Sequence, residues 1–229
     1  YHAGVHNKAN VKIKWIDSET INKKNVGELL SKAAGILIPG GFGNRGISGK
    51  IEAIRHAREN QIPFLGICLG MQLSIIEFTK NVLKMKNSGS SEFGKHTNNV
   101  ISLMTEWSKK NQKVKRTKEN DLGATMRLGS YPCYIKEKSL ASKVYKKKLI
   151  HERHRHRYEV NPKYRSSIEK KGLVFSGFSK DKKLLEIIEN KNHKWFLGVQ
   201  FHPELKSKPF KPHPIFFSFI KNSLINKNA

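Results

Sequence analysis

The chain has 229 residues, a formal charge of +26 and only two cysteines, Cys68 and Cys133. This length suits one ordinary domain that needs neither disulfides nor a structural metal. The two cysteines lie far apart and lack Cys/His spacing, which excludes a disulfide scaffold and a zinc site. We therefore expect no metal ion and a reducing compartment. No apolar run approaches the roughly 20 residues that cross a bilayer, which predicts a soluble, cytoplasmic protein without membrane contact.

The positive charge comes from 44 lysines and arginines against 18 aspartates and glutamates. A balance of this size raises the possibility of nucleic-acid binding. The lysines, however, are spread over the whole chain, which is typical of a solvated surface. We therefore expect no specific nucleic-acid partner, only weak and salt-sensitive adhesion to polyanions.

Taken in chain order, the first 83 residues predict alternating strands and helices. Residues 1–10 are typical of a helix end that runs into a turn. Strands are predicted at residues 11–16, 35–38 and 63–67, and helices at residues 21–32, 48–60 and 69–83. Because strands that alternate with helices form right-handed crossovers, this part predicts a parallel sheet with helices on both faces.

From residue 84 onward, shorter segments predict a partly antiparallel portion. A polar loop is expected before a strand at residues 100–104, and residues 109–121 are expected to form a charged, flexible turn. Further strands are predicted at residues 125–128, 131–135, 150–160, 174–178, 184–188 and 195–201, and helices at residues 140–145 and 162–171. The sequence therefore predicts an α/β fold with a mostly parallel central sheet, flanking helices and a smaller antiparallel portion, in one domain over residues 1–229.

Cys68 is the candidate nucleophile, because it lies where an apolar strand meets an amphipathic helix. Gly66 and Gly70 flank it at two residues on either side, and they lack the side chains that would clash where strand and helix approach. We expect the helix N-terminus to favour the thiolate and to lower the pKa of Cys68. A buried structural cysteine is the simpler alternative, so a base and an oxyanion hole are also required.

The glycine-rich segment PGGFG follows the predicted strand at residues 35–38. Its spacing is neither G-x-G-x-x-G nor that of a Walker loop, so dinucleotide binding is not expected. Such a loop can instead leave a backbone N–H pointed at a developing oxyanion. We expect Gly41 to supply that N–H.

The last predicted strand ends in QFHPE, which supplies a candidate base. His202 can accept the thiol proton and later protonate a leaving amine, and Glu204 can bond the other ring nitrogen and fix its tautomer. Taken alone, a solvent-facing His/Glu pair at a strand end is the better explanation of these residues, because nine other histidines are available and most must be structural. The pair gains a catalytic interpretation because it is found together with the Cys68 elbow.

These motifs resemble class I glutamine amidotransferases, which release ammonia from glutamine through a Cys-His-Glu triad. The resemblance is closer to the glutaminase domains of CTP synthases and spans nearly the whole chain. The segments that carry it are ILIPGGFGNRGISGKI, LGICLGMQLSIIEF, NSGSSEF, LGATMRLG, HERHRHRYEVN and VQFHPELKSKP. The resemblance implies a flavodoxin-like fold and a triad of Cys68, His202 and Glu204.

The resemblance also implies the residues that bind the substrate L-glutamine. An oxyanion hole would be formed by the amides of Gly41 and Leu69. Glu92 would meet the α-ammonium group and Arg157 the α-carboxylate of the zwitterion. The residues implied to bind glutamine are Gly41, Leu69, Gly70, Met71, Gln72, Glu92 and Arg157.

For the longer protein, the resemblance implies a synthase that phosphorylates UTP with ATP and Mg²⁺ and aminates it with ammonia from this domain. It further implies activation by GTP and a homotetramer. No cofactor is expected to bind this chain itself. The synthetase domain, the first strand and most of the first helix of the family are absent from the sequence, so we expect the isolated chain to hydrolyse glutamine poorly or not at all.

Two alternatives stay open at the level of the sequence. One is the amidotransferase domain of another synthase, such as that for GMP, which shares the triad but lacks HERHRHRYEVN and MRLG. The other is a basic nucleic-acid-binding or scaffolding protein with an idle triad. A glutaminase assay beside a DNA titration at two salt concentrations would separate the second alternative from the enzyme.

Overall fold

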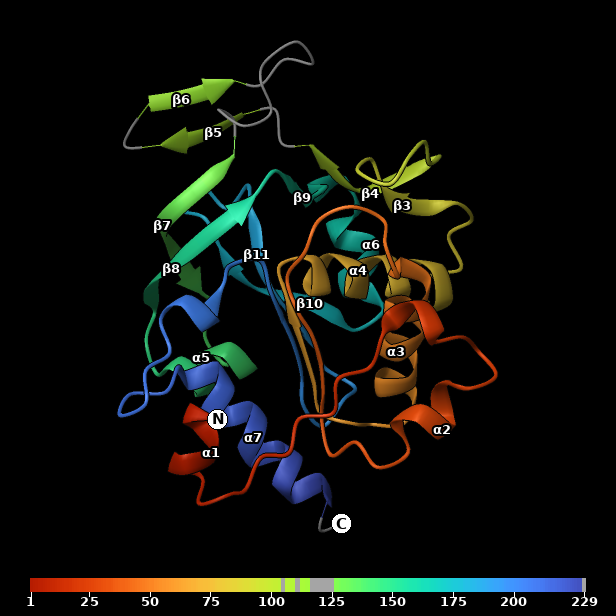
Figure 1. Ribbon diagram of the computed structural model, residues 1–229. Coiled ribbons are helices and arrows are strands. Elements are labelled where there is room, and N and C mark those ends of the chain that lie inside the picture. The colour runs from red at the N-terminus through yellow and green to blue at the C-terminus, as the bar shows by residue number, and fades with distance from the viewer. Residues whose placement is uncertain (104–105, 110–111, 116–125, 228–229) are drawn as a thin grey trace.

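The computed structural model describes residues 1–103, 106–109, 112–115 and 126–227 (Figure 1). Its helices are α1 (His2–His6), α2 (Val26–Leu30), α3 (Ile47–Glu59), α4 (Leu69–Asn81), α5 (Leu140–Tyr145), α6 (Arg165–Lys170) and α7 (Pro214–Lys227). Short 3₁₀ turns occur at η1 (Ser18–Thr20), η2 (Pro162–Tyr164) and η3 (Pro203–Leu205). The strands are β1 (Ile36–Ile38), β2 (Phe64–Ile67), β3 (Ser88–Ser90), β4 (Asn98–Leu103), β5 (Glu106–Lys109), β6 (Gln112–Lys115), β7 (Arg127–Ile135), β8 (Leu149–His156), β9 (Tyr158–Val160), β10 (Leu173–Phe178), β11 (Leu185–Asn190) and β12 (Phe196–Val199).

A seven-stranded mixed sheet in the order β1-β2-β12-β11-β10-β7-β8 forms the centre of the molecule. Strands β1, β2 and β12 run parallel, and the remaining neighbours in the sheet pair antiparallel. Two small sheets, β3-β4-β9 and β5-β6, lie at its upper end in Figure 1. The predicted α/β class with flanking helices is confirmed, and the antiparallel part is larger than the sequence indicated.

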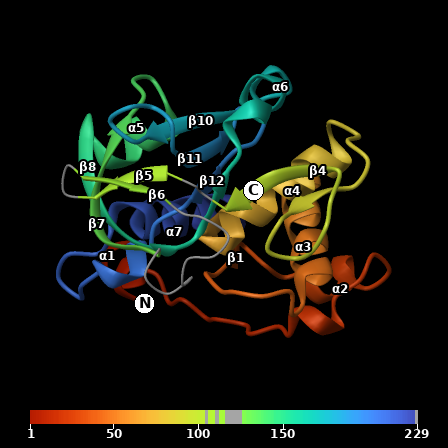
Figure 2. The same ribbon diagram turned by 90° about the horizontal axis from the view of Figure 1, so that it is seen from above.

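Helices cover both faces of this sheet (Figure 2). Alternate residues of β2 and β12 face opposite sides of the sheet. Phe64 and Phe196 lie in a core shared with α3 and α4. Leu65 and Leu197 lie in a second core shared with α5 and α7. The period of two in a strand thus gives two apolar faces, and each face requires its own layer of helices. The N- and C-terminal helices α1 and α7 pack against each other at one end of the molecule (Figure 1).

Helix α4 is enclosed on nearly all sides, with residues 69–79 buried. Its one acidic side chain, Glu77, is fully inaccessible and accepts three hydrogen bonds, at 2.7, 2.9 and 3.2 Å, from the guanidinium of Arg58 on α3. A bidentate pair of this kind satisfies a charge that would otherwise be costly to bury. The pair fixes α4, and with it the residue that precedes the helix, Cys68.

The predicted strand at residues 11–16 is wrong. These residues form no strand, and two of their apolar side chains, Ile13 and Trp15, are 43% and 86% exposed. An alternating pattern gives a strand only where a neighbouring strand accepts its hydrogen bonds. Among the residues that the structure describes, none pairs with this segment.

Several other predicted boundaries differ from the structure. The helix at residues 21–32 is reduced to α2, and the helix at residues 162–171 is divided into η2 and α6. Residues 127–135 form the single strand β7, residues 150–160 are split at Arg157 between β8 and β9, and the helix α7 was not predicted. Part of the expected turn at residues 109–121 is the strand β6. Residues 110–111 and 116–121 of that turn, and residue 125 of the strand predicted at residues 125–128, lie outside the described residues.

Most of the remaining predictions are confirmed within one or two residues, but the expected polar loop before residue 100 contains the strand β3, and residue 104 of the strand predicted at residues 100–104 lies outside the described residues. Strands β1, β2, β4 and β12, helices α3, α4 and α5, and the β10–β11 hairpin lie where the sequence placed them. The three parallel strands carry PGGFG, Cys68 and His202 just beyond their carboxyl ends. These ends share one edge of the sheet, which is where open α/β sheets bind ligands.

Candidate active site

Cys68 lies at the corner between β2 and α4 in a strained backbone conformation. Its φ of 51° and ψ of −102° fall outside the regions that non-glycine residues usually occupy. The corner is held by its neighbours, because the amide of Cys68 donates a 2.7 Å hydrogen bond to the carbonyl of Val199 on β12. The predicted nucleophile elbow is present.

The two flanking glycines permit this corner because there is no room for side chains. A Cβ on Gly70 would lie 2.2 Å from the carbonyl oxygen of Ile38, and one on Gly66 would lie 2.7 Å from the backbone of Gly70. Both distances are shorter than any contact that a real Cβ atom makes. The start of α4 therefore packs directly on β1 and β2, as the sequence predicted.

The thiol of Cys68 is only 2% exposed, and its ionisation differs from the expectation. Burial raises the pKa of Cys68 to about 12, the amide of Leu69 opposes this rise, and the carboxylates of Glu159, Glu204 and Glu92 add to it. The helix N-terminus acts in the predicted direction, but desolvation outweighs it. In this structure Cys68 is a thiol at neutral pH and needs a base.

His202 and Glu204 supply the geometry of that base. The Nδ1 of His202 lies 2.6 Å from Glu204 Oε1, so Nδ1 carries the proton that it donates to the carboxylate. The Nε2 atom is then the acceptor, is buried, and has no hydrogen-bond partner among the described residues. The backbone amide of His202 donates a 2.8 Å hydrogen bond to the carbonyl of Arg153, which ties the histidine to β8.

Gly40 lies close to both Cys68 and His202, although the sequence analysis did not single it out. A Cβ at Gly40 would lie 2.8 Å from His202 Cε1 and 3.5 Å from the Cβ of Cys68. The imidazole and the thiol-bearing carbon therefore flank the same point of the glycine loop. The Cε1 edge of the ring, which lies between its two nitrogens, faces this glycine.

The rest of the glycine loop lies beside the predicted substrate residues. Gly41 lies against the side chain of Leu69, and the amide of Gly43 donates a 3.0 Å hydrogen bond to Glu92 Oε1. Burial raises the pKa of the half-buried Glu92, while the Gly43 amide and the charge of Arg157 oppose this rise. Glu92 thus both anchors the loop and lies within electrostatic reach of Arg157, which is half-buried at the bend between β8 and β9.

Two of the predicted glutamine-binding residues have side chains that face the protein interior. Met71 is fully buried in the core with α3 and the sheet, which leaves only its main chain for a substrate. Gln72 donates hydrogen bonds to the carbonyl of Tyr158 at 3.0 Å and to Gln200 Oε1 at 3.1 Å. Gln200, which the sequence analysis missed, in turn places its Nε2 3.8 Å from Cys68 Sγ.

Neither a metal site nor a membrane span is found in the part of the chain that the structure describes. Its histidine, cysteine, aspartate and glutamate side chains form no group of three or more that could hold a metal ion. No described helix has the length and apolar character required to cross a bilayer.

We predict that the reactivity of Cys68 toward iodoacetamide rises steadily between about pH 6 and pH 10, because only the thiolate reacts and its pKa is raised. A glutamine-mimicking electrophile is expected to label Cys68 at neutral pH, where His202 takes the proton. Cys133, whose buried thiol also has a raised pKa, is the internal control and should remain unlabelled. Peptide mass mapping measures both, and an iodoacetamide rate that levels off below pH 8 would contradict the buried thiol.

Comparisons with known proteins agree with this geometry. The family model for glutamine amidotransferase class-I matches residues 1–222. The CTP synthase of Pelagibacter ubique is 59% identical over 220 residues, which are 96% of this chain and 41% of that protein. The CTP synthase of Rhodospirillum rubrum is 50% identical over 97% of this chain and 41% of its own length. The chain therefore spans about two fifths of the curated relatives that it matches.

Solved structures show the same relationship. The glutaminase domain of Trypanosoma brucei CTPS with bound acivicin has a TM-score of 0.86 and 36% identity, and the match covers 98% of this chain and 84% of that one. A protein of the GMP synthase type from Thermoplasma acidophilum, with a TM-score of 0.55 and 14% identity over 99% of this chain and 85% of its own, shares the fold alone. The chain belongs to the class-I glutamine amidotransferase family and is similar over nearly its whole length to the glutaminase domain of the Trypanosoma brucei CTPS.

Proposed function

We propose that Cys68, His202 and Glu204 hydrolyse L-glutamine in this chain and that the ammonia is used by a synthetase domain of a longer protein. The observation that carries the proposal is the convergence at Gly40 of a strained Cys68 with a His202 whose Nδ1 is bonded to Glu204. A nucleophile, its base and the group that orients the base are thus present at one strand-end edge.

Glutamine recognition is assigned to the two charged residues beside the glycine loop. Arg157 binds the α-carboxylate, and Glu92 binds the α-ammonium group. The electrostatic interaction between Glu92 and Arg157 supports this assignment, because opposite charges within reach of each other match the two ends of an amino acid. A simple amide lacks both charged groups and would be rejected.

The first chemical step is attack of Cys68 Sγ on the side-chain carbonyl carbon of glutamine. Because the thiol has a pKa raised to about 12, its proton must pass to His202 Nε2 as the sulfur–carbon bond forms. The amides of Gly41 and Leu69 donate to the oxyanion of the tetrahedral intermediate. The interaction of the Leu69 amide with the thiol of Cys68 and the contact of Gly41 with Leu69 support this placement.

Collapse of the intermediate breaks the carbon–nitrogen bond, and His202 returns its proton to the leaving nitrogen, so ammonia departs. Water, deprotonated by the same Nε2, then attacks the γ-glutamyl thioester. The sulfur–carbon bond breaks, Cys68 recovers its proton, and glutamate leaves. Glu204 stabilises the imidazolium in both halves of the reaction through its 2.6 Å contact with Nδ1.

The longer protein is proposed to be a cytoplasmic CTP synthase that aminates UTP. Its synthetase domain would bind UTP, ATP and Mg²⁺, GTP would activate glutamine hydrolysis, and the whole would form a homotetramer. The names of relatives that are 50–59% identical support this proposal. No step of the nucleotide chemistry is assigned to residues of this chain.

The direct test of the function uses Cys68→Ala in the longer protein. We expect glutamine-dependent formation of CTP and glutaminase activity to be lost, and formation of CTP from added ammonia to be retained. Loss of the ammonia-dependent reaction would mean that the substitution damages the fold, in which case Cys68→Ser serves as the second variant. Glutaminase activity that persists in a folded Cys68→Ala protein would contradict the proposed nucleophile.

Arg157→Ala is expected to raise the KM for glutamine strongly, by roughly a hundredfold, with a smaller effect on kcat, because a bidentate carboxylate contact is lost. Lys143→Ala, at an exposed position on α5, removes the same charge and is the matched control. Steady-state glutaminase kinetics of the longer protein measure both effects. Similar effects of the two substitutions would show that the general positive field, rather than a clamp, attracts the substrate.

Gly40→Ala is expected to reduce turnover by about a hundredfold, because the new Cβ would lie 2.8 Å from His202 Cε1 and would displace the base. Gly27→Ala on α2 is the matched control, since its Cβ meets nothing closer than 4.0 Å. Both variants are compared in the longer protein by glutaminase rate and thermal unfolding. Unchanged turnover in Gly40→Ala would show that His202 does not need this position.

A further inference from the structure

A cluster of buried ionisable side chains lies behind the proposed glutamine clamp. Its members come from four strands and are each at most 4% exposed: Arg127 on β7, His154 and His156 on β8, Glu159 on β9, and Glu186 on β11. The mechanism above uses none of them. Five such side chains are rarely buried together without a function for the site that they adjoin.

The cluster is connected by contacts with Arg127 near its centre. The guanidinium of Arg127 lies 2.5 Å from Glu186 Oε1, 3.5 Å from Glu159 Oε1 and 3.3 Å from His154 Nδ1. His154 Nδ1 is also 2.8 Å from His156 Nε2. The Nε2 of His154 faces Glu186 Oε2 at 3.9 Å.

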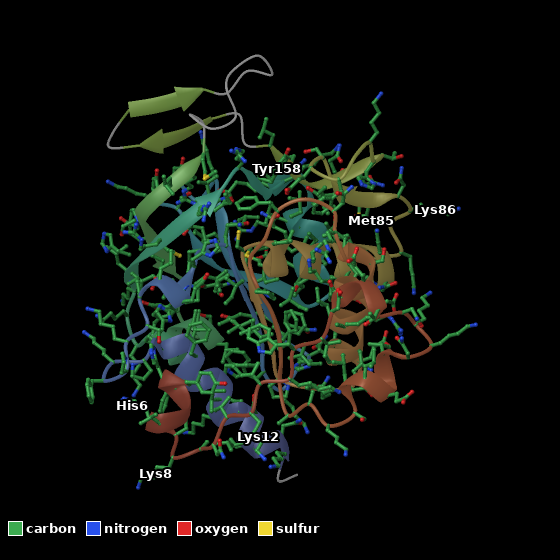
Figure 3. The ribbon with its side chains drawn as sticks, in the orientation of Figure 1. His6, Lys8, Lys12, Met85, Lys86 and Tyr158 are labelled. Atoms are coloured by element: carbon green, nitrogen blue, oxygen red, sulfur yellow. The ribbon has the colours of Figure 1, made fainter. Side chains whose placement is uncertain are left out.

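The strand that carries both histidines also touches the catalytic residues with its main chain. The carbonyl of Arg153 accepts the amide proton of His202 at 2.8 Å, and the carbonyl of Arg155 lies 4.0 Å from Cys68 Sγ. His156 is the last residue of β8, and Arg157 follows at the bend before β9. Tyr158, labelled in Figure 3, begins β9 and pairs with Leu103 of β4.

The directions of the hydrogen bonds determine where the protons of the two histidines lie. Arginine can only donate, so His154 Nδ1 is an acceptor, and the proton of the 2.8 Å contact must belong to His156 Nε2. His156 Nδ1 faces the carbonyl of Tyr158 at 3.2 Å and Glu159 Oε1 at 3.5 Å, and both of these are acceptors. Each ring nitrogen of His156 therefore carries a proton.

The charge balance of the cluster leads to the same assignment. Glu159 and Glu186 contribute two negative charges, and Arg127 contributes one positive charge. With both histidines neutral, the buried cluster would carry an uncompensated charge, which is costly in a low-dielectric interior. Burial and the nearby charges of Arg127, His156 and His202 lower the pKa of His154 well below its usual value, so the compensating proton does not belong there.

We propose that His156 is an imidazolium that positions the glutamine clamp. Its proton on Nδ1 bonds across the bend to the carbonyl of Tyr158, and its charge lies 3.5 Å from Glu159 Oε1. These two contacts fix Arg157, which lies between His156 and Tyr158 in the chain. The proton on Nε2 of His156 bonds to His154 Nδ1, which also accepts from Arg127, so the bend is connected to both of these residues. The same charge partly neutralises Glu159, one of the carboxylates that raise the pKa of Cys68. The proposal rests on the proposed glutaminase function, and it names His156 as a positioning residue without contact to substrate.

The kinetic test, carried out in the longer protein, compares two single variants with their combination. His156→Gln keeps a side chain that can donate hydrogen bonds but removes the charge, and Glu159→Gln removes the opposite charge. Each is expected to raise the KM for glutamine by roughly tenfold to a hundredfold, with a smaller effect on kcat. The double variant restores the charge balance and is expected to recover most of the lost affinity. His151→Gln changes an exposed histidine of the same strand and is the control.

The proton itself is measured by ¹⁵N NMR of histidine-labelled protein at neutral pH, with His156→Gln used to assign the signal. We expect His156 to show two protonated ring nitrogens. A neutral ring, or a double variant that binds glutamine no better than the singles, would overturn the proposal. If a single variant fails to fold, as seen by circular dichroism, the wild-type NMR signal still decides, because it can be assigned through bonds from the backbone of His156. Inactivity of the wild-type longer protein toward glutamine would instead refute the proposed function, which the NMR measurement does not depend on.

Discussion

The close contact between the start of α4 and the strands β1 and β2 is the constraint on which the site depends. No side chain fits between Gly66, Gly70 and the carbonyl of Ile38, so the chain must turn sharply at Cys68. The positive φ of Cys68 is the result of that packing. The same contact places the first amide of α4 beside the sulfur and brings PGGFG, which follows β1, next to both. One steric condition thus positions the nucleophile and both proposed oxyanion donors.

The second factor that shapes the site is burial, which disfavours the thiolate form of Cys68 until a substrate is bound. Burial, with smaller contributions from nearby carboxylates, raises the pKa of Cys68 to about 12, so this thiol, on a residue that is 2% exposed, holds its proton at neutral pH. His202 is prepared to accept the proton because Glu204 fixes its tautomer. The ionic cluster of Arg127, Glu159, Glu186 and the two buried histidines shapes the other side of the site through β8. Polar contacts, rather than apolar packing, therefore set the position of that strand.

The sequence predicted the parts of this site that depend on local order and missed those that depend on long-range pairing. The Cys68 elbow, its glycines and the HPE strand end were found because each is a short pattern with a direct steric or chemical meaning. The roles of Gly40 and Gln200 could not be derived, since they act through residues far along the chain. In LIHERHRH the buried positions are mainly charged or polar, so its alternation gave no sign of which face is inside. The strand prediction for residues 11–16 was wrong for the converse reason, because this strand-like pattern has no partner strand among the described residues.

The central claim is that Cys68 forms a covalent intermediate with glutamine by passing its proton to His202. The most direct measurement is rapid acid quenching of the protein during glutamine turnover, followed by peptide mass analysis. A γ-glutamyl group on the peptide that contains Cys68 is expected in the wild type, and none is expected in Cys68→Ala or in His202→Asn, which cannot accept the thiol proton. Ammonia release from glutamine without an adduct on Cys68, or with an adduct on another residue, would contradict the claim.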